Sequence, residues 1–363
     1  MLYIKQLDTV RAIAAILVIL THWLPIPYIQ YSGFVGVNIF FVLSGFLITR
    51  ILFEHRNEAE ESGISKLTVF KNFFFRRALR ILPIYFLMVF MLYLFGSNVD
   101  PKTDSELIYL STFTINFHFY NLKYFGDLTA QCWSLAVEEQ FYLLWPWVIL
   151  YINKKYLLHA ILAFILIGTT SQFFINDFEY GYLPTYTCFD AFGLGALLSW
   201  VMVYRPHLLN KTYKVLHLLV ILSALLLAGR LSGAIGVPMP IRTLVSVIAL
   251  WVITYLMYKS QTNEIGFSFL FNNKLLLFMG KISYGLYLYH ISLPYIVWAF
   301  AKYMKPYISS LADNYLFYVF ANVSLLFLVP WLSWRFIEKP FLSLKKYFVY
   351  QKAATPTPAR AAV

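Results

Sequence analysis

Long runs of apolar residues, separated by short polar segments, make up most of this 363-residue chain. A helix of roughly 20 apolar residues is long enough to cross the hydrocarbon core of a bilayer. Runs that approach this length predict ten spanning helices. They lie near residues 9–24, 33–52, 80–96, 135–152, 157–175, 186–203, 213–231, 240–258, 281–300 and 315–337.

Two further apolar segments are too short or too polar to count as spans. Residues 107–120 are rich in Thr and Asn, and we expect them to form a non-spanning or interfacial helix in a long outer loop. Residues 270–279 are expected to form a helix on the cytoplasmic surface. We expect residues 1–345 to form one membrane domain and the remaining 346–363, rich in Pro and Ala at their end, to form a disordered cytoplasmic tail.

Composition supports this interpretation, because 60% of the residues are hydrophobic and only 13% are charged. Soluble domains run near ~45–50% apolar and ~25% charged residues. A soluble enzyme, a disordered chain and a disulfide scaffold are therefore excluded. The expected fold class is an all-α polytopic membrane protein, a bundle of spanning helices.

The net charge of +12 comes from 29 Lys and Arg against 17 Asp and Glu. Membrane proteins concentrate such residues in cytoplasmic loops, so we expect a lipid environment and no nucleic-acid partner. With ten crossings and both termini cytoplasmic, the basic segment 50–80 and Lys154–Lys155 fall inside. The outer loops are then neutral or acidic, except for Lys302 and Lys305.

Ionisable groups inside a membrane are costly and are candidates for function. Arg11 precedes His22 by eleven residues, about three helical turns, so the two share one face of the first helix. Arg11 would lie near the cytoplasmic end and His22 near the outer end. A neutral imidazole can take a proton from a hydroxyl. A histidine that only bonds a neighbouring carbonyl would give the same pattern.

Two adjacent carboxylates, Glu138 and Glu139, lie one turn inside the outer end of the helix predicted at 135–152. At least one of them should face the bundle, at the depth of His22, where a carboxylate would orient the imidazole. The favourable interaction of a carboxylate with a helix N-terminus explains one of the two without any catalytic role.

Three arginines, Arg76, Arg77 and Arg80, open the helix predicted at 80–96 on its cytoplasmic side. Guanidinium groups suit the binding of phosphate, although arginines at this position are also explained as topology anchors.

Three uncharged or neutral polar positions are further binding candidates. Asn38 and Ser44 accompany small residues in the helix predicted at 33–52 and could line a polar cavity. His290 lies in the middle of the predicted 281–300 span, where a structural role and a substrate contact are equally consistent with the sequence. No Cys and His spacing typical of a metal site is present, so no metal is expected.

Six motifs occur in the order found in the acyltransferase 3 family, which this chain resembles over about residues 5–342. They are LDTVRAIAA with the following His22, GVNIFFVLSGFLI, RRALRILP, WSLAVEEQFYLLWP, SYGLYLYH and IEKPF. Members are integral membrane acyltransferases that decorate bacterial polysaccharides, lipids and small molecules. The resemblance implies a multi-pass protein of the bacterial inner membrane with cytoplasmic acyl-CoA, usually acetyl-CoA, as co-substrate and no tightly bound cofactor.

The resemblance also implies roles for single residues. His22 matches the family's catalytic base, Arg77 and Arg80 match arginines that handle the acyl-CoA, and Glu138 matches the Glu of the WSL motif. Position 38 is often Asp in the family and is Asn here, which argues against an acidic role. Many relatives carry a fused extracytoplasmic hydrolase-like domain. We expect this chain to act without it or with a separate protein.

The expected function is therefore transfer of an acyl group, acetyl above all, from acyl-CoA to a hydroxyl of a cell-surface polysaccharide or lipid-linked sugar. A proton-coupled transporter or flippase of a lipid or sugar is the alternative, since buried His, Glu and Arg also suit a carrier. The sequence shows no repeat of two halves, which many carriers have. The acceptor, the acyl group, the choice between direct transfer and an acyl-enzyme, and the oligomeric state stay open.

Overall fold

The structure is a computed structural model that describes residues 4–348 except 25, 28, 176, 178, 263–265, 267 and 308–313. Every regular element in these residues is helical. The long helices are α1 (Gln6–Trp23), α2 (Ser32–Ser62), α3 (Lys66–Phe95), α6 (Cys132–Tyr151), α7 (Leu157–Phe174), α8 (Phe189–Tyr204), α9 (Leu209–Leu231), α10 (Ile241–Thr262) and α16 (Tyr315–Ser333). The shorter ones are α4 (Thr103–Ser111), α5 (Ile115–Leu122), α11 (Ser268–Phe271), α12 (Lys274–Lys281), α13 (Ser283–Tyr289), α14 (Ser292–Met304) and α17 (Lys339–Ser343).

Eight helices in the described part of the chain are long and apolar enough to cross a membrane, so the protein is a multi-pass membrane protein. They contain α1, α2, α3, α7, α8, α9, α10 and α16. Two of the ten predicted spans are absent from this set. One is α6, which has 20 residues and carries Glu138 and Glu139. The other is the predicted 281–300 span, which the structure divides into α13 and α14.

The division between α13 and α14 has a local cause in the sequence. Pro294 has no backbone N–H, so it cannot donate the helical hydrogen bond to the carbonyl of His290 four residues earlier. The indole Nε1 of Trp23 donates to that carbonyl instead, at 2.9 Å. The prediction of one continuous helix over 281–300 is therefore wrong, and His290 lies at the break.

Helix α3 also begins much earlier than the sequence predicted. Its 30 residues start at Lys66, where the Ser65 side chain accepts a hydrogen bond from the backbone N–H of Thr68 and so caps the helix. Arg77 and Arg80 consequently lie near the middle of α3. The prediction that the arginines open this helix is wrong, because an amphipathic helix can carry charged residues well before its uniformly apolar part.

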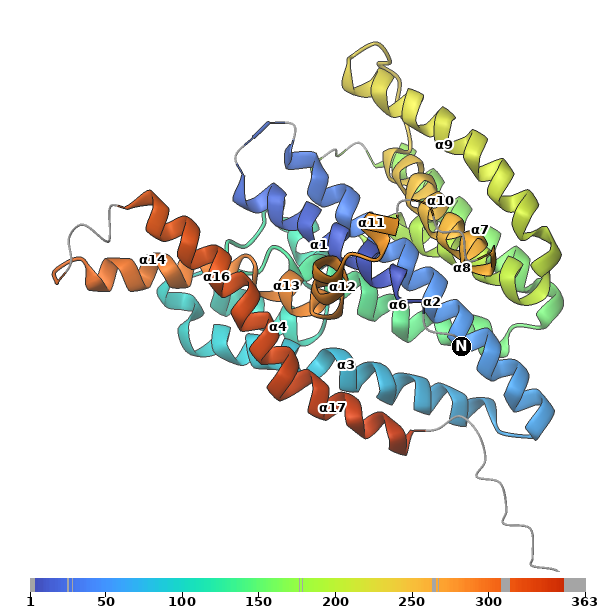
Figure 1. The fold of residues 1–363 in the computed structure, drawn as a ribbon, viewed down its shortest axis with the longest axis horizontal. Coiled ribbons are helices and arrows are strands. Elements are labelled where there is room, and N and C mark those ends of the chain that lie inside the picture. Colours follow the sequence, from blue (N-terminus) through green and yellow to red (C-terminus); the bar gives the residue numbers. More distant parts are fainter. Residues whose placement is uncertain are drawn as a thin grey trace, which may run out of the picture.

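The bundle is centred on α2, which packs against α1 and α8, with α9 at one side and α14 and α16 at the other (Figure 1). Glycines set the close approach of these helices. A Cβ on Gly45 of α2 would collide with the carbonyl of Phe192 in α8, and one on Gly195 of α8 would collide with the carbonyl of Val42. Backbone thus meets backbone at the centre of the fold.

Residues 107–120 do not form one continuous helix. They form parts of α4, with nine residues, and α5, with eight, which are separated by Phe113 in a left-handed conformation with φ 53°. Neither helix approaches the ~20 residues that a crossing needs. Glu106 of α4 is 1% exposed and accepts a hydrogen bond from Thr129 Oγ1 at 2.5 Å. Its burial raises the pKa of this carboxyl above its usual range.

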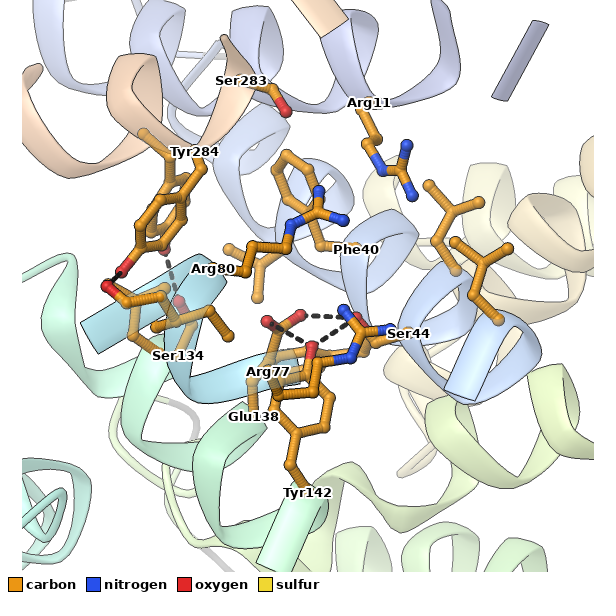
Figure 2. A pocket seen from close by; sticks show the side chains of 17 residues that line it. Arg11, Phe40, Ser44, Arg77, Arg80, Ser134, Glu138, Tyr142, Ser283 and Tyr284 are labelled. Carbon is orange, nitrogen blue, oxygen red and sulfur yellow. Dashed lines mark hydrogen bonds between the residues drawn. The ribbon is translucent and has the colours of Figure 1, made fainter. Parts of the chain in front are cut away.

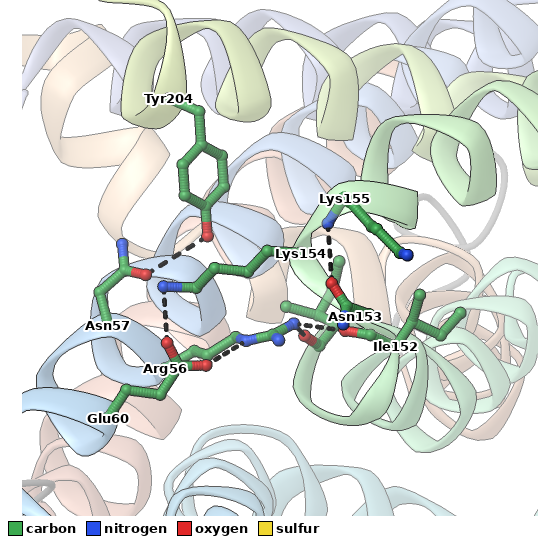
Figure 3. Close-up of polar contacts among 9 residues, drawn as sticks. Arg56, Asn57, Glu60, Ile152, Asn153, Lys154, Lys155 and Tyr204 are labelled. Atoms are coloured by element: carbon green, nitrogen blue, oxygen red, sulfur yellow. Dashed lines mark hydrogen bonds and ion pairs between the residues drawn. The ribbon is translucent and has the colours of Figure 1, made fainter.

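The ends of α2 and α6 meet on one side of the molecule (Figure 3). Arg56 Nη1 donates to the carbonyls of Ile149 and Ile152 at the end of α6, at 2.5 and 2.8 Å. Lys154, just after α6, pairs with Glu60 of α2 at 2.6 Å. The basic segment 50–80 and Lys154–Lys155, which the sequence predicts on the same side of the membrane, are therefore adjacent. This agrees with the expectation that residues 107–120 do not cross the membrane.

Helix α12 covers most of the segment predicted as a surface helix at 270–279, and it packs directly on α1. Gly280 is the contact point, because a Cβ there would collide with the carbonyl of Asp8. At the other end of the chain, residues 344–347 form a 3-10 turn. The rest of the predicted tail, from residue 349 on, lies outside the described residues.

Candidate functional site

A cavity of about 90 Å³ opens between α1, α2, α3, α6 and α13 (Figure 2). A water molecule needs roughly 10–15 Å³ of such space, so the cavity holds several waters or a short acyl chain. Its lining combines apolar and polar side chains. They are Arg11, Val37, Phe40, Phe41, Leu43, Ser44, Leu47, Arg77, Arg80, Ile81, Ser134, Leu135, Glu138, Tyr142, Ser283, Tyr284 and Tyr287.

Three guanidinium groups reach this cavity, Arg11 from α1 and Arg77 and Arg80 from α3 (Figure 2). Arg11 forms an ion pair with Asp8 at 2.7 Å, one turn earlier on α1. Arg77 lies over the ring of Tyr142, 5.4 Å from its centroid, which is a cation–π contact. Such a cluster of partly buried positive charge has the chemistry to bind an anion, since guanidinium suits phosphate and carboxylate.

Glu138 supplies negative charge on the opposite wall of the cavity. Ser44 Oγ donates to Glu138 Oε1 at 2.8 Å, and the hydroxyl of Tyr142 donates to Oε2 at 2.9 Å. The two hydroxyl groups lie 3.1 Å apart, so Ser44, Glu138 and Tyr142 form one network. Each carboxylate oxygen thus accepts a hydrogen bond, and the two bonds hold Glu138 in this cavity, which we call the arginine cavity.

His22 lies elsewhere, near the other end of α1 from the arginine cavity. Eleven residues separate it from Arg11, roughly 16 Å at 1.5 Å per residue. Its side chain is exposed, and its Nδ1 lies 2.9 Å from the carbonyl of Val18. The neighbouring ionisable side chain is His290, whose Nε2 lies 3.3 Å from His22 Nδ1.

The structure therefore separates two residues that we expected at one depth. Glu138 is bonded inside the arginine cavity, whereas His22 faces His290. The prediction assumed that Arg77 and Arg80 stay at the cytoplasmic start of their helix. The structure instead places them near the middle of α3, where they line the same cavity as Glu138.

Three other predicted site residues do not line the cavity. Asn38 is 1% exposed and donates to the carbonyl of Phe34 on its own helix at 2.7 Å. Arg76 donates to the carbonyls of Lys345 and Phe348, both at 3.1 Å, and so joins α3 to the end of the described chain. His290 is fully buried beside His22.

Sequence reasoning did not single out several residues of the cavity. Tyr142 lies four residues after Glu138 on α6, one helical turn away, and this spacing could have identified it. Tyr284 and Tyr287, which belong to the same sequence motif as His290, reach the cavity from α13. Glu338, 5% exposed in a π-helical turn (Trp334–Glu338), does not line the cavity but lies within electrostatic reach of Arg80.

Comparison with known proteins bears on this site. A family model described as an acyltransferase domain matches residues 4–335, nearly the whole chain. A candidate O-acetyltransferase of Staphylococcus aureus (strain COL) is 29% identical over 377 residues, covering 94% of this chain and 58% of the relative. The peptidoglycan O-acetyltransferase of Listeria monocytogenes serovar 1/2a is 27% identical over 365 residues, covering 93% of this chain and 56% of the relative.

A candidate peptidoglycan O-acetyltransferase of Bacillus subtilis (strain 168) is 37% identical over 158 residues, which is 40% of this chain. The chain thus spans less than two thirds of the length of these relatives. No solved structure matches it.

Proposed function

Because this chain belongs to the acyltransferase 3 family, we propose that it is a membrane-bound O-acetyltransferase. It would move an acetyl group from cytoplasmic acyl-CoA to a hydroxyl of a cell-surface polysaccharide or lipid-linked sugar. The observation that carries the proposal is the cavity in which Arg11, Arg77 and Arg80 face Glu138, with His22 on the same helix as Arg11.

In this proposal the arginine cavity binds the acyl donor. Coenzyme A is polyanionic, and Arg77 and Arg80 would bind its phosphates through paired N–H groups. Basic residues continue from the cavity toward the N-terminal start of α3, where Arg76 contacts the segment that contains Lys345. We expect the donor to approach from that side, between α3 and α17, which run side by side (Figure 1).

His22 supplies the acceptor side. In this proposal its imidazole takes the proton of the acceptor hydroxyl as the oxygen attacks the thioester carbonyl. The C–S bond of the thioester breaks, and the CoA thiolate leaves with that proton. About 16 Å along α1 separates His22 from Arg11, a distance suited to the extended pantetheine arm of CoA. Transfer through an acyl-imidazole on His22 is the second route.

The two relatives named for peptidoglycan O-acetylation support a cell-wall or cell-surface glycan as the acceptor. They also support a site at the outer face of a bacterial plasma membrane. An exposed His22 at the end of α1 opposite the arginine cavity fits an acceptor that arrives from outside.

The proposal is tested with purified protein in lipid nanodiscs, supplied with radiolabelled acetyl-CoA and cell-wall glycans. Free CoA and labelled glycan should appear together, and Arg80→Ala should suppress both. A transporter or flippase would consume no acetyl-CoA, so unchanged donor in the presence of a full set of glycan acceptors would contradict the proposal. NMR of surface glycans from a deletion strain would then identify the acyl group and the acceptor.

A further inference from the structure

Two imidazole rings meet at the break between α13 and α14. The rings of His22 and His290 are 4.9 Å apart between centroids and inclined by 67°, with His290 Nε2 3.3 Å from His22 Nδ1. His290 is fully buried, whereas His22 is exposed. The inference drawn from this pair rests on the proposed function, in which His22 is the base.

The proton positions follow from what each nitrogen faces. His290 Nδ1 lies 2.7 Å from the carbonyl oxygen of Tyr287, which can only accept, so Nδ1 of His290 carries a proton. A fully buried imidazole without a carboxylate partner is neutral, since burying a charge is costly. Its Nε2 therefore bears a lone pair, and this lone pair faces His22.

His22 Nδ1 thus faces two acceptors, the carbonyl of Val18 at 2.9 Å and His290 Nε2 at 3.3 Å. We propose that His290 is a positioning residue that holds His22 in the Nδ1–H tautomer and leaves its Nε2 free to take the acceptor's proton. This is the task that we expected of Glu138, performed by a neutral ring instead of a carboxylate.

The surroundings hold His290 in place from several sides. Trp23 Nε1 donates to its carbonyl at 2.9 Å, and Gln131 Nε2 donates to the carbonyl of Leu288 at 3.0 Å. The hydroxyl of Tyr287 lies 2.5 Å from Ser134 Oγ. Tyr287 therefore contacts His290 through its backbone carbonyl and reaches the arginine cavity with its side chain.

A neutral partner also suits the location. When His22 takes a proton, its Nδ1–H can still donate to the lone pair of His290, which steadies the imidazolium. A carboxylate in the same fully buried position would be left as a buried charge without a cationic partner each time His22 returns to its neutral form. The neutral ring of His290 avoids this cost, and the proton that His22 has taken up at Nε2 can still be passed on.

Kinetics of three variants test the role. His290→Leu removes the lone pair, and we expect kcat for acetyl transfer to fall about tenfold or more with KM for acetyl-CoA unchanged. His290→Gln keeps a carbonyl acceptor and should recover most of the rate. His217→Leu, on the distant α9, is the matched control and should behave as wild type. Equal losses in the Leu and Gln variants would overturn the proposal.

The tautomer itself is measured by ¹⁵N NMR of protein labelled at histidine, with the His22 signals assigned by difference from His22→Asn. The wild type should show a protonated Nδ1 and an unprotonated Nε2. In His290→Leu only the Val18 carbonyl still accepts from Nδ1, so the fraction of the Nε2–H tautomer should rise. An Nε2–H tautomer in the wild type, or spectra unaffected by His290→Leu, would overturn the proposal. Failure of the wild type to transfer acetyl would instead overturn the proposed function.

Discussion

Individual residues of the candidate site were predictable where the cost of burying charge identified them. Arg11 and Glu138 were identified as ionisable groups inside apolar helices, and both line the cavity. Arg77 and Arg80 also line it, but they were identified by the affinity of guanidinium for phosphate and were expected at the start of their helix. Ser44 was expected at a polar cavity and bonds Glu138 there. The partner of His22 was not predictable, because it depends on where two helices from opposite ends of the chain meet.

The first prediction at this scale concerns His22. We expect His22→Ala to lower acetyl transfer by at least about 100-fold, because the proton of the acceptor hydroxyl loses its base. The exposed side chain makes few packing contacts, so membrane levels on immunoblots should match those of wild type. A well-expressed His22→Ala protein that still acetylates glycan would show that the base lies elsewhere.

The second concerns the arginines, for which α3 supplies its own control. Arg77→Lys and Arg80→Lys keep the charge but lose the paired N–H groups, so KM for acetyl-CoA should rise about tenfold. Arg76→Lys should leave it unchanged, because Arg76 contacts backbone carbonyls outside the cavity, to which lysine can also donate. Titration with acetyl-CoA at saturating acceptor measures all three. If all three keep the wild-type KM, the arginines are topology anchors.

At the scale of elements, the positions of most long helices were predictable from runs of apolar residues, and their ends were not. Helix α3 extends to Lys66 because Ser65 caps it and because charged residues are compatible with a helix. The break at His290 follows from Pro294, which inside one continuous helix over 281–300 would leave the carbonyl of His290 without its helical donor. Both departures bring site residues together, which a count of spans alone does not show.

The contact between α2 and α8 gives the third prediction. Gly195→Val would place side-chain atoms against the backbone of Val42 and Phe46, which cannot move aside without shifting α2. Overpacking typically costs about 1–3 kcal/mol, and more where backbone is the obstacle. We expect a lower unfolding temperature in detergent. Gly236→Val is the control, because a Cβ there meets no atom within 4 Å, and it should melt as wild type.

For the whole molecule, the class and the overall architecture were predictable from composition and loop charges, whereas the count of ten crossings depends on α6 and the α13–α14 pair. The structure places the ends of α2 and α6 together through Arg56, Glu60 and Lys154 (Figure 3). If α2 and α6 end on the same side, the chain between them crosses the membrane an even number of times. We expect α3 and α6 to supply these two crossings and the short helices α4 and α5 to supply none.

The last prediction tests this topology with single cysteines. The native thiols, Cys132 and Cys188, are free and 0% exposed, so a membrane-impermeant maleimide should leave intact wild-type cells unlabelled. Ser105→Cys in α4 and Lys155→Cys after α6 introduce thiols at exposed positions. With a cytoplasmic N-terminus, Ser105→Cys should label in intact cells and Lys155→Cys only after the membrane is opened. Labelling of both variants in intact cells would mean that the 103–122 segment crosses the membrane, and the positions of His22 and the arginine cavity relative to the two faces would have to be reassigned.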